Sequence, residues 1–105
     1  MYEQIALQDA ESLLVENTTV IVDVRDKDSY IRAHIPNALH LSVTELQKFC
    51  EKTPKSSCIV VYCYRGISSQ SVAQHLVDQG FQKVHSLAGG FEAWEKDRLT
   101  KTRMG

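Results

Sequence analysis

Apolar runs and helical patterns alternate along the whole chain. The runs 20–24 and 59–62 are almost continuously apolar and β-branched, which is typical of strands that are buried on both faces. Shorter runs at 2–7, 39–41 and 83–87 predict three further strands. Segments with apolar residues at helical spacing separate these runs, and they predict helices at 9–15, 26–33, 43–51, 70–79 and from 91 to about 97.

This alternation predicts an α/β fold with a central, mainly parallel five-stranded sheet flanked by helices on both faces. In such sheets, ligands bind beyond the carboxyl ends of the strands. The 105 residues suffice for one compact domain, which we place at residues 1–96. We expect residues 97–105 to form a basic, solvated and partly mobile C-terminal tail.

Two local signals predict helix ends. Ser42 and Glu45 have the spacing of a capping box at the start of the helix 43–51. Gly80 stands where a helix that ends near residue 79 places its terminal glycine.

The composition narrows the class of protein. Hydrophobic residues make up 43% of the chain and support a real core. The net charge of -1 gives no argument for a nucleic-acid partner or a membrane surface. No apolar run approaches the roughly 18 residues of a membrane span, and the first residues lack the basic and apolar regions of a signal peptide. We therefore expect a cytoplasmic protein with no nucleic-acid and no membrane partner.

The three cysteines, Cys50, Cys58 and Cys63, cannot all pair in disulfides. Cys58 and Cys63 lie at the two ends of one predicted strand, roughly 16 Å apart, which exceeds the ~7 Å that a disulfide spans between Cα atoms. We expect Cys50 and Cys58 to serve as small buried apolar groups.

Cys63 stands where the strand 59–62 meets a short loop and the start of the next helix. Backbone N–H groups and the positive end of the helix dipole favour negative charge at such a point. A thiol in this position has a lowered pKa and is partly ionised. We therefore predict that Cys63 is a catalytic nucleophile that acts on an anionic substrate. The candidate substrate-binding residues follow it directly: Tyr64, Arg65, Gly66, Ile67, Ser68 and Ser69.

The loop residues suit an anionic ligand for different reasons. Gly66 permits a tight turn or a close approach of the ligand. Arg65 offers a cation to an anion. Ser68 and Ser69 can cap the helix, which is the plainer interpretation, or donate hydrogen bonds to a bound oxyanion.

Other cysteine chemistries fit the sequence less well. Tyrosine-phosphatase-like and arsenate-reductase loops need an arginine six residues after the cysteine, where this chain has Ser69. A thioredoxin-type Cys-x-x-Cys motif needs a cysteine where Gly66 stands. The histidines show no spacing typical of zinc ligands, and these are His34, His40, His75 and His85.

Three segments, in order and at matching spacing over about residues 4–96, resemble the rhodanese (thiosulfate sulfurtransferase) family. The residues Cys63-Tyr64-Arg65-Gly66-Ile67-Ser68 are similar to its active-site loop, Cys-x-x-Gly-x-Ser/Thr. The residues Asp23-Val24-Arg25, with Tyr30, His34-Ile35-Pro36 and Ala38, are similar to its segment Asp-Val-Arg…Tyr/Phe…Gly-His-Ile-Pro-Gly-Ala. The residues Leu87-Ala88-Gly89-Gly90-Phe91-Glu92-Ala93-Trp94 are similar to its closing Gly-Gly…Trp segment. The short chain most resembles the small single-domain bacterial members, of the GlpE type.

The chain departs from the family at two positions that usually hold glycine. Asn37 replaces one glycine, and asparagine tolerates a left-handed backbone. Ala33 replaces the other, which indicates ordinary helical geometry there. We expect Asp23 and Arg25 to give structural support near the loop, as an ion pair or a cap. We expect Gly89 and Gly90 to make a tight turn, and Trp94 to pack on the sheet.

The resemblance implies a rhodanese-like single domain and a sulfurtransferase. Such an enzyme moves the sulfane sulfur of thiosulfate to a thiophilic acceptor through a persulfide on Cys63 and releases sulfite. The acceptor is cyanide in the usual assay and plausibly a thioredoxin-like dithiol in the cell. The resemblance implies no metal or organic cofactor, and Arg65 would tune the choice of donor.

Two alternatives remain open. One is a sulfur-relay protein that is loaded by a cysteine desulfurase or by a partner persulfide. The other is a non-catalytic binding module on the rhodanese fold. Such modules typically lack the loop cysteine, so Cys63 argues against the second alternative.

Overall fold

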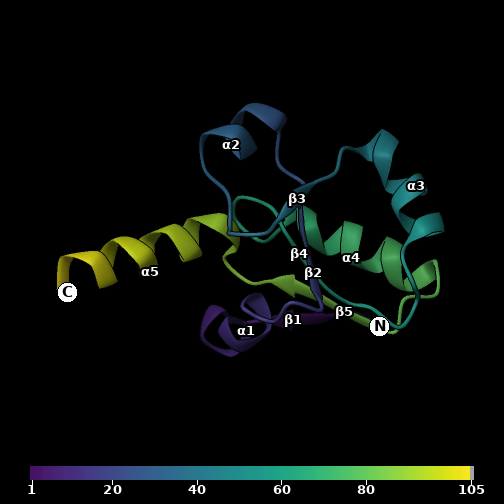
Figure 1. Ribbon diagram of the computed structural model, residues 1–105, viewed down its shortest axis with the longest axis horizontal. Helices are drawn as coiled ribbons and strands as arrows, with labels where there is room; N and C mark the ends of the chain where they lie inside the picture. The colour runs from purple at the N-terminus through teal and green to yellow at the C-terminus, as the bar shows by residue number, and fades with distance from the viewer. Residues whose placement is uncertain (105) are drawn as a thin grey trace.

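The computed structural model describes residues 1–104, and their side chains as far as Lys101. The elements follow one another in the order β1 (Glu3–Ile5), α1 (Leu7–Leu14), β2 (Thr19–Asp23), α2 (Lys27–Arg32), β3 (Leu39–His40), α3 (Val43–Lys52), β4 (Cys58–Tyr62), α4 (Ser68–Asp78), β5 (Lys83–Leu87) and α5 (Gly90–Met104). The five strands form one sheet in the order β1-β5-β4-β2-β3, and every neighbouring pair is parallel (Figure 1). The predicted α/β fold with a five-stranded sheet is confirmed.

Two hydrophobic cores lie on opposite faces of the sheet, because successive strand residues point to opposite sides. On β4, Val60 and Tyr62 enter one core together with apolar side chains from α1 and α5. Ile59 and Val61 enter the other core with side chains from α3 and α4. Helices therefore cover both faces, which explains why the run 59–62 is apolar at every position.

The last helix extends further than the sequence pattern predicts. Its predicted end near Asp97 was wrong, because α5 continues to Met104. Lys101 holds the added turns: its ammonium lies 2.9 Å from the Glu11 carboxylate on α1 and 3.0 Å from the Asp97 carboxylate. A domain limit at residue 96 stays a prediction, and the part of the predicted tail at residue 105 lies outside the described residues.

The helix-end signals in the sequence are confirmed. The Glu45 carboxylate accepts a hydrogen bond from the Ser42 backbone N–H at 2.9 Å, as in a capping box. Gly80 has a φ of 104° and follows the end of α4, and its N–H donates to the Val77 carbonyl at 2.9 Å. These residues end or begin helices through contacts within a few positions, which is why the sequence reveals them.

The segment between α2 and β3 follows one prediction and departs from another. Asn37 has a φ of 70°, the left-handed backbone expected of a residue that replaces glycine. The prediction of helical geometry at Ala33 was wrong, because its φ of -166° and ψ of 139° are extended. This conformation ends α2 at Arg32 and turns the Ala33 carbonyl toward the guanidinium of Arg25, which donates to it at 2.6 Å.

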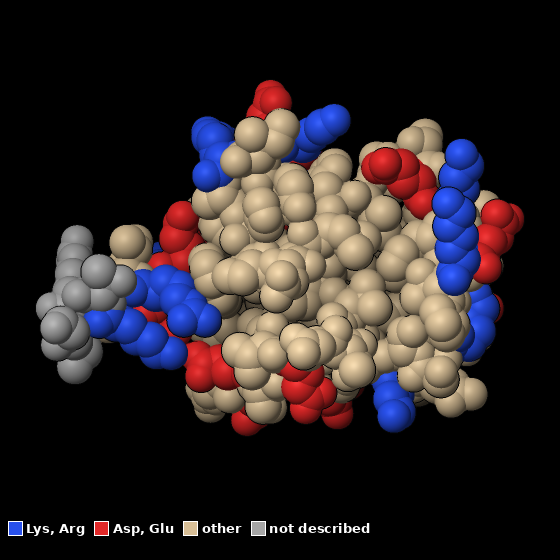
Figure 2. Space-filling view, in the orientation of Figure 1, with Lys and Arg blue, Asp and Glu red and all other residues tan. Residues whose placement is uncertain are grey.

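The face of the molecule shown in Figure 2 has no large region of a single charge. There, acidic and basic side chains are mixed around the rim, and the centre over the sheet and α4 is uncharged. Within the described residues, no helix is both long enough and apolar enough to span a membrane.

Candidate active site

Cys63 lies directly after the last residue of β4, at the carboxyl end of the sheet. β4 pairs with β5 on one side and with β2 on the other, so Cys63 follows an interior strand. Residues 63–67 form the loop that leads into α4 at Ser68. The Cys63 side chain is almost entirely buried, with a relative exposure of 5%.

Hydrogen-bonding groups of the loop and of the first turn of α4 surround the sulfur atom of Cys63. The backbone N–H groups of Gly66 and Ser69 donate to Sγ at 3.1 and 3.3 Å. The Ser69 hydroxyl oxygen lies 3.4 Å from Sγ. Burial alone raises the pKa of Cys63, but the hydroxyls of Ser68 and Ser69 and these two N–H groups outweigh it and lower the pKa to about 7. A large fraction of the thiol is therefore ionised at neutral pH.

The structure divides the predicted binding residues into two groups. Gly66 and Ser69 are buried beneath the sulfur. The other four are exposed at the surface of the loop, and these are Tyr64, Arg65, Ile67 and Ser68.

The capping interpretation of the two serines was wrong. Ile67 is the N-cap residue of α4, and its side chain makes no capping hydrogen bond. Ser69 lies two residues after the N-cap, inside the helix, and its hydroxyl is directed toward Cys63 in the interior.

The first turn of α5 holds the loop in place. The N–H of Phe91 donates to the Cys63 carbonyl at 2.9 Å, and the N–H of Glu92 donates to the Tyr64 carbonyl at 2.9 Å. The first N–H groups of a helix have no partner within the helix, so loop carbonyls satisfy them here. The start of α5 thereby fixes the backbone at Cys63 and at Tyr64.

Glycines allow this close approach. Gly66 has a φ of 83°, and a Cβ atom there would lie 2.7 Å from the Gly89 nitrogen. Gly90 has a φ of 57°, and a Cβ atom there would lie 2.7 Å from the Tyr64 carbonyl oxygen. The sequence analysis expected only a tight turn at Gly89 and Gly90 and missed their contact with the loop. The signal available in the sequence was a pair of adjacent glycines next to the start of the last predicted helix.

Ser86 on β5 is a second residue that the sequence analysis missed. Its hydroxyl lies 2.9 Å from the Ser69 hydroxyl, and both side chains are completely buried. The sequence contains no clear signal for Ser86, because β5 has the mixed sequence Lys-Val-His-Ser-Leu and nothing in it indicates which side chain the serine faces.

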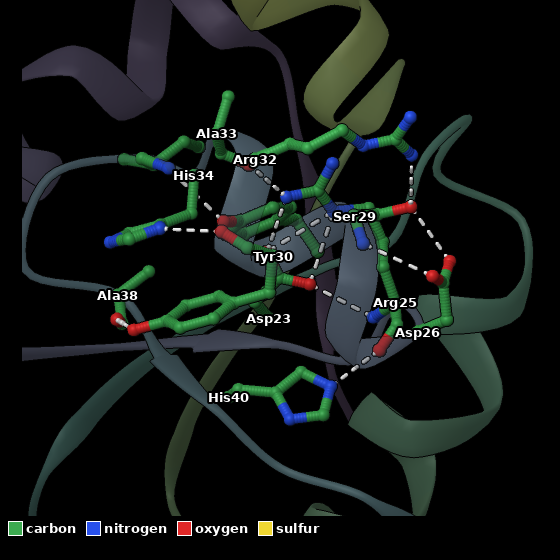
Figure 3. A network of polar contacts seen from close by, with 12 residues as sticks. Asp23, Arg25, Asp26, Ser29, Tyr30, Arg32, Ala33, His34, Ala38 and His40 are labelled. Carbon is green, nitrogen blue, oxygen red and sulfur yellow. Dashed lines mark hydrogen bonds and ion pairs between the residues drawn. The ribbon is translucent and has the colours of Figure 1, made fainter.

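Asp23 and Arg25 form the buried ion pair that the sequence analysis expects. The guanidinium of Arg25 lies 2.8 Å from the Asp23 carboxylate, and the side chains are 7% and 0% exposed. Arg25 also donates to the Ala33 carbonyl (Figure 3), and its Cζ lies 4.0 Å from the ring centroid of Phe91. The pair thus connects the end of β2 with the end of α2 and with the first turn of α5.

Two cavities flank the loop. One, of about 410 Å³, is lined by Ser68 together with Arg25 and apolar side chains such as Val43 and Leu46. The other, of about 310 Å³, is lined by Tyr64 together with Arg25 and Arg32. Neither of these two cavities is lined by Cys63: the first lies at the start of α4, and the second lies beside Tyr64 of the loop.

Two of the histidines lie within hydrogen-bond distance of backbone carbonyl groups. His34 Nδ1 lies 2.8 Å from the Tyr30 carbonyl oxygen, and His40 Nε2 lies 2.6 Å from the Arg25 carbonyl oxygen (Figure 3). Within residues 1–104, no group of three or more His, Cys, Asp or Glu side chains could hold a metal ion.

All three cysteines are free thiols. Cys50 is buried as predicted, whereas Cys58 is only half-buried. Burial raises the pKa of both thiols.

Comparison with known proteins agrees with this geometry. The rhodanese-like domain family matches residues 6–97. A Coxiella burnetii protein named thiosulfate sulfurtransferase GlpE is 58% identical over 100 residues, which cover 95% of this chain and 94% of that protein. A Vibrio cholerae protein of the same name is 42% identical over 90 residues, which cover 86% of this chain and 85% of that protein.

A solved structure shows the same fold. The crystal structure of the Alr3790 protein from Anabaena superposes with a TM-score of 0.80 at 26% identity and covers 95% of this chain and 87% of that one. The family match spans most of the chain, and the two sulfurtransferases are similar over nearly their whole length. The chain therefore belongs to the rhodanese family and is a rhodanese-type enzyme.

Proposed function

We propose that this enzyme transfers the sulfane sulfur of thiosulfate to a thiophilic acceptor through a persulfide on Cys63. The names of the relatives from Coxiella burnetii and Vibrio cholerae support sulfurtransferase activity. The observation that carries the proposal is the surroundings of the buried Cys63 sulfur: two backbone N–H groups and a hydroxyl lie within hydrogen-bond distance of it. This arrangement favours a negative charge on Cys63 Sγ, which is the nucleophile in the first half-reaction and the leaving group in the second.

In the first half-reaction, the Cys63 thiolate attacks the outer sulfur of thiosulfate. A bond forms between Sγ and that sulfur, the sulfur–sulfur bond of thiosulfate breaks, and sulfite leaves with the bonding electron pair. The N–H groups of Gly66 and Ser69 are already directed at Sγ and stabilise the anion without reorganisation. Arg65, exposed on the same loop, attracts the doubly negative donor.

In the second half-reaction, the acceptor attacks the outer sulfur of the persulfide. Cyanide takes this sulfur to form thiocyanate, and the electron pair of the broken bond returns to Cys63 as thiolate. A thioredoxin-like dithiol takes it as a persulfide, and its second thiol then forms a disulfide and releases hydrogen sulfide. Because a covalent intermediate separates the two halves, the kinetics are of the double-displacement type.

The proposed chemistry needs no metal or organic cofactor, because every bond change occurs between sulfur atoms or between sulfur and cyanide carbon. The first half-reaction needs Cys63 as a free, reduced thiol, and the second half-reaction restores it. Three free thiols fit a reducing compartment, and we propose the cytoplasm as the location.

Mass spectrometry tests the proposal. Incubation of the reduced protein with thiosulfate should add about 32 Da, one sulfur atom, to the peptide that contains Cys63. Later addition of cyanide should remove the added mass and release thiocyanate. The Cys63→Ser variant is the control and should gain no mass.

The same experiment separates the sulfur-relay alternative. A protein that gains no mass from thiosulfate but gains it from cysteine persulfide would contradict thiosulfate as donor and favour the relay. A protein that gains no mass from either reagent would contradict a persulfide on Cys63.

A further inference from the structure

Behind the reacting sulfur lies a second buried hydroxyl, from Ser86 on β5. Ser86 pairs with Gln4 of β1 and with Val61 of β4 in the sheet, so its backbone position is held from both sides. Its side chain is completely buried. A hydroxyl that is removed from water in this way needs a hydrogen-bond partner, and Ser69 provides it at 2.9 Å.

Ser69 connects Ser86 with the sulfur atom. Its hydroxyl oxygen lies 3.4 Å from Cys63 Sγ and 2.9 Å from the hydroxyl oxygen of Ser86. The three side chains therefore form a chain of hydrogen bonds from the sulfur into the interior of the sheet. Ser86 does not contact the sulfur and can influence it only through Ser69.

The direction of these hydrogen bonds depends on the charge of the sulfur. In the thiol, the S–H group donates to the Ser69 hydroxyl oxygen, which leaves the Ser69 hydroxyl proton to be donated to Ser86; the Ser69–Ser86 distance fits either serine as donor. When the proton leaves to solvent, the Ser69 hydroxyl turns and donates to the thiolate. Its oxygen is then free to accept from the Ser86 hydroxyl, and a hydroxyl that accepts a hydrogen bond is a stronger donor in turn.

We propose that Ser86 is a positioning residue of the active site, whose hydroxyl orients the hydroxyl of Ser69 toward the reacting sulfur of Cys63. The proposal rests on the proposed function only in that it takes Cys63 as the reacting residue. It adds β5 to the elements that build the site, beside the loop, α4 and the first turn of α5.

Other ionisable groups surround this corner of the molecule. The loop contributes Tyr64 and Arg65, and α5 contributes Glu92. The end of β2 and the residues after it contribute Asp23 and Arg25, and β4 contributes Tyr62. The N-terminal segment and β5 contribute Tyr2, Glu3 and His85. Among the described residues, none of these side chains forms a hydrogen bond with Cys63 Sγ or with the hydroxyls of Ser69 and Ser86. Replacing Ser86 therefore changes the hydroxyl chain and leaves these groups in place.

The test is the pH dependence of alkylation of Cys63 by iodoacetamide, followed by mass spectrometry of the Cys63 peptide. Removing the hydroxyl in Ser86→Ala should raise the apparent pKa of Cys63 by about half a pH unit, because the thiolate loses part of its stabilisation. Ser69→Ala should raise it by at least as much. In the double variant, Ser86→Ala should add no further shift, since Ser86 acts only through Ser69.

A pair of variants of equal size separates this role from simple packing. Ser86→Thr keeps the hydroxyl and should retain the wild-type pH profile, whereas Ser86→Val should show the shift of Ser86→Ala. Both remain informative if Ser86→Ala does not fold. An unshifted profile in Ser86→Ala or Ser86→Val, with only a lower melting temperature, would overturn the proposal. A shift of full size in the Ser69→Ala background would also overturn it.

The result of the alkylation test does not depend on which sulfur donor the enzyme uses. Alkylation measures the reactivity of the thiol without any sulfur transfer. A failure of thiosulfate to load Cys63 therefore contradicts the proposed function and leaves the test of Ser86 intact. An unshifted pH profile contradicts the role of Ser86 and leaves the loading experiment intact.

Discussion

Strand β4 begins with Cys58 and is followed directly by Cys63, so one strand places a thiol at each end of the sheet. Burial raises the pKa of Cys58, and the neighbouring charge of Lys83 does not restore it to the ordinary value. Burial acts on Cys63 in the same direction, but the serine hydroxyls and the backbone N–H groups bring its pKa down to about 7. Hydrogen-bond donors aimed at the sulfur therefore have a larger effect here than a neighbouring cation.

The two ends differ because of what the chain does next to each cysteine. After Cys63 the loop turns into α4, and the N–H groups of this turn have no partner within the helix. Two of them point at Sγ. Before Cys58 the chain passes through residues 53–57, where no helix begins. The carboxyl end of the sheet thus builds an anion site, and the amino end does not.

The largest expected difference between the two thiols is in sulfurtransferase activity. Cys63→Ser should lower thiocyanate formation from thiosulfate and cyanide by more than about 1,000-fold, because the covalent intermediate is lost. Cys58→Ser should retain most of the activity, although it removes a thiol from the same strand. Equal losses in the two variants would remove the functional distinction between the ends of β4.

The second difference is in the pH dependence of alkylation. The alkylation rate at Cys63 should rise with pH through a midpoint near 7 and then level off, because the thiol is almost fully ionised well above that pH. The rate at Cys58 should still be rising beyond the usual thiol pKa of about 8.5, and at pH 7 Cys63 should react roughly threefold faster or more, because its larger thiolate fraction outweighs the lower nucleophilicity of a less basic thiolate. Peptide-resolved mass spectrometry measures both sites in one sample. Matching profiles would contradict the comparison.

The third prediction concerns the backbone support of the loop. Gly90→Ala should lower the free energy of unfolding by about 2–4 kcal/mol and kcat/KM by about tenfold, because the added methyl group meets the loop carbonyls at a positive φ. Gly80→Ala is the matched control. Gly80 also has a positive φ, but only the Lys55 side chain lies near, at 3.9 Å.

The control should therefore lose about 1 kcal/mol of stability and no activity. Urea unfolding and steady-state kinetics measure the two quantities. If the two variants lost the same activity, the start of α5 would have no special role at the loop.

The smallest expected effect concerns the cations at the two ends. Arg65→Ala should raise KM for thiosulfate by about threefold to tenfold and change kcat little, because an exposed cation contributes mainly to binding of the anionic donor. Lys83→Ala, which removes the cation beside Cys58, should leave KM unchanged. Steady-state kinetics at low and high salt measure both, and an unchanged KM in Arg65→Ala would exclude Arg65 from donor binding.

The sequence by itself determined the order of the elements, the parallel sheet and the position of Cys63. These follow from local patterns: apolar runs, helical spacing, and a cysteine between a strand and a helix start. The sequence also led us to expect an ion pair or a cap from Asp23 and Arg25, two residues apart, and the structure shows the ion pair.

Only the tertiary structure decided which groups surround the sulfur. Ser86 meets Ser69 across 17 residues of chain, and the pairing of β4 with β5 sets which side chains face each other. The contact of Gly90 with the loop likewise depends on how β5 ends and α5 begins beside β4. A one-residue change of register would turn Ser86 to the opposite face, and no local pattern specifies that register. Sequence therefore locates the proposed nucleophile, and packing between strands selects the groups that surround it.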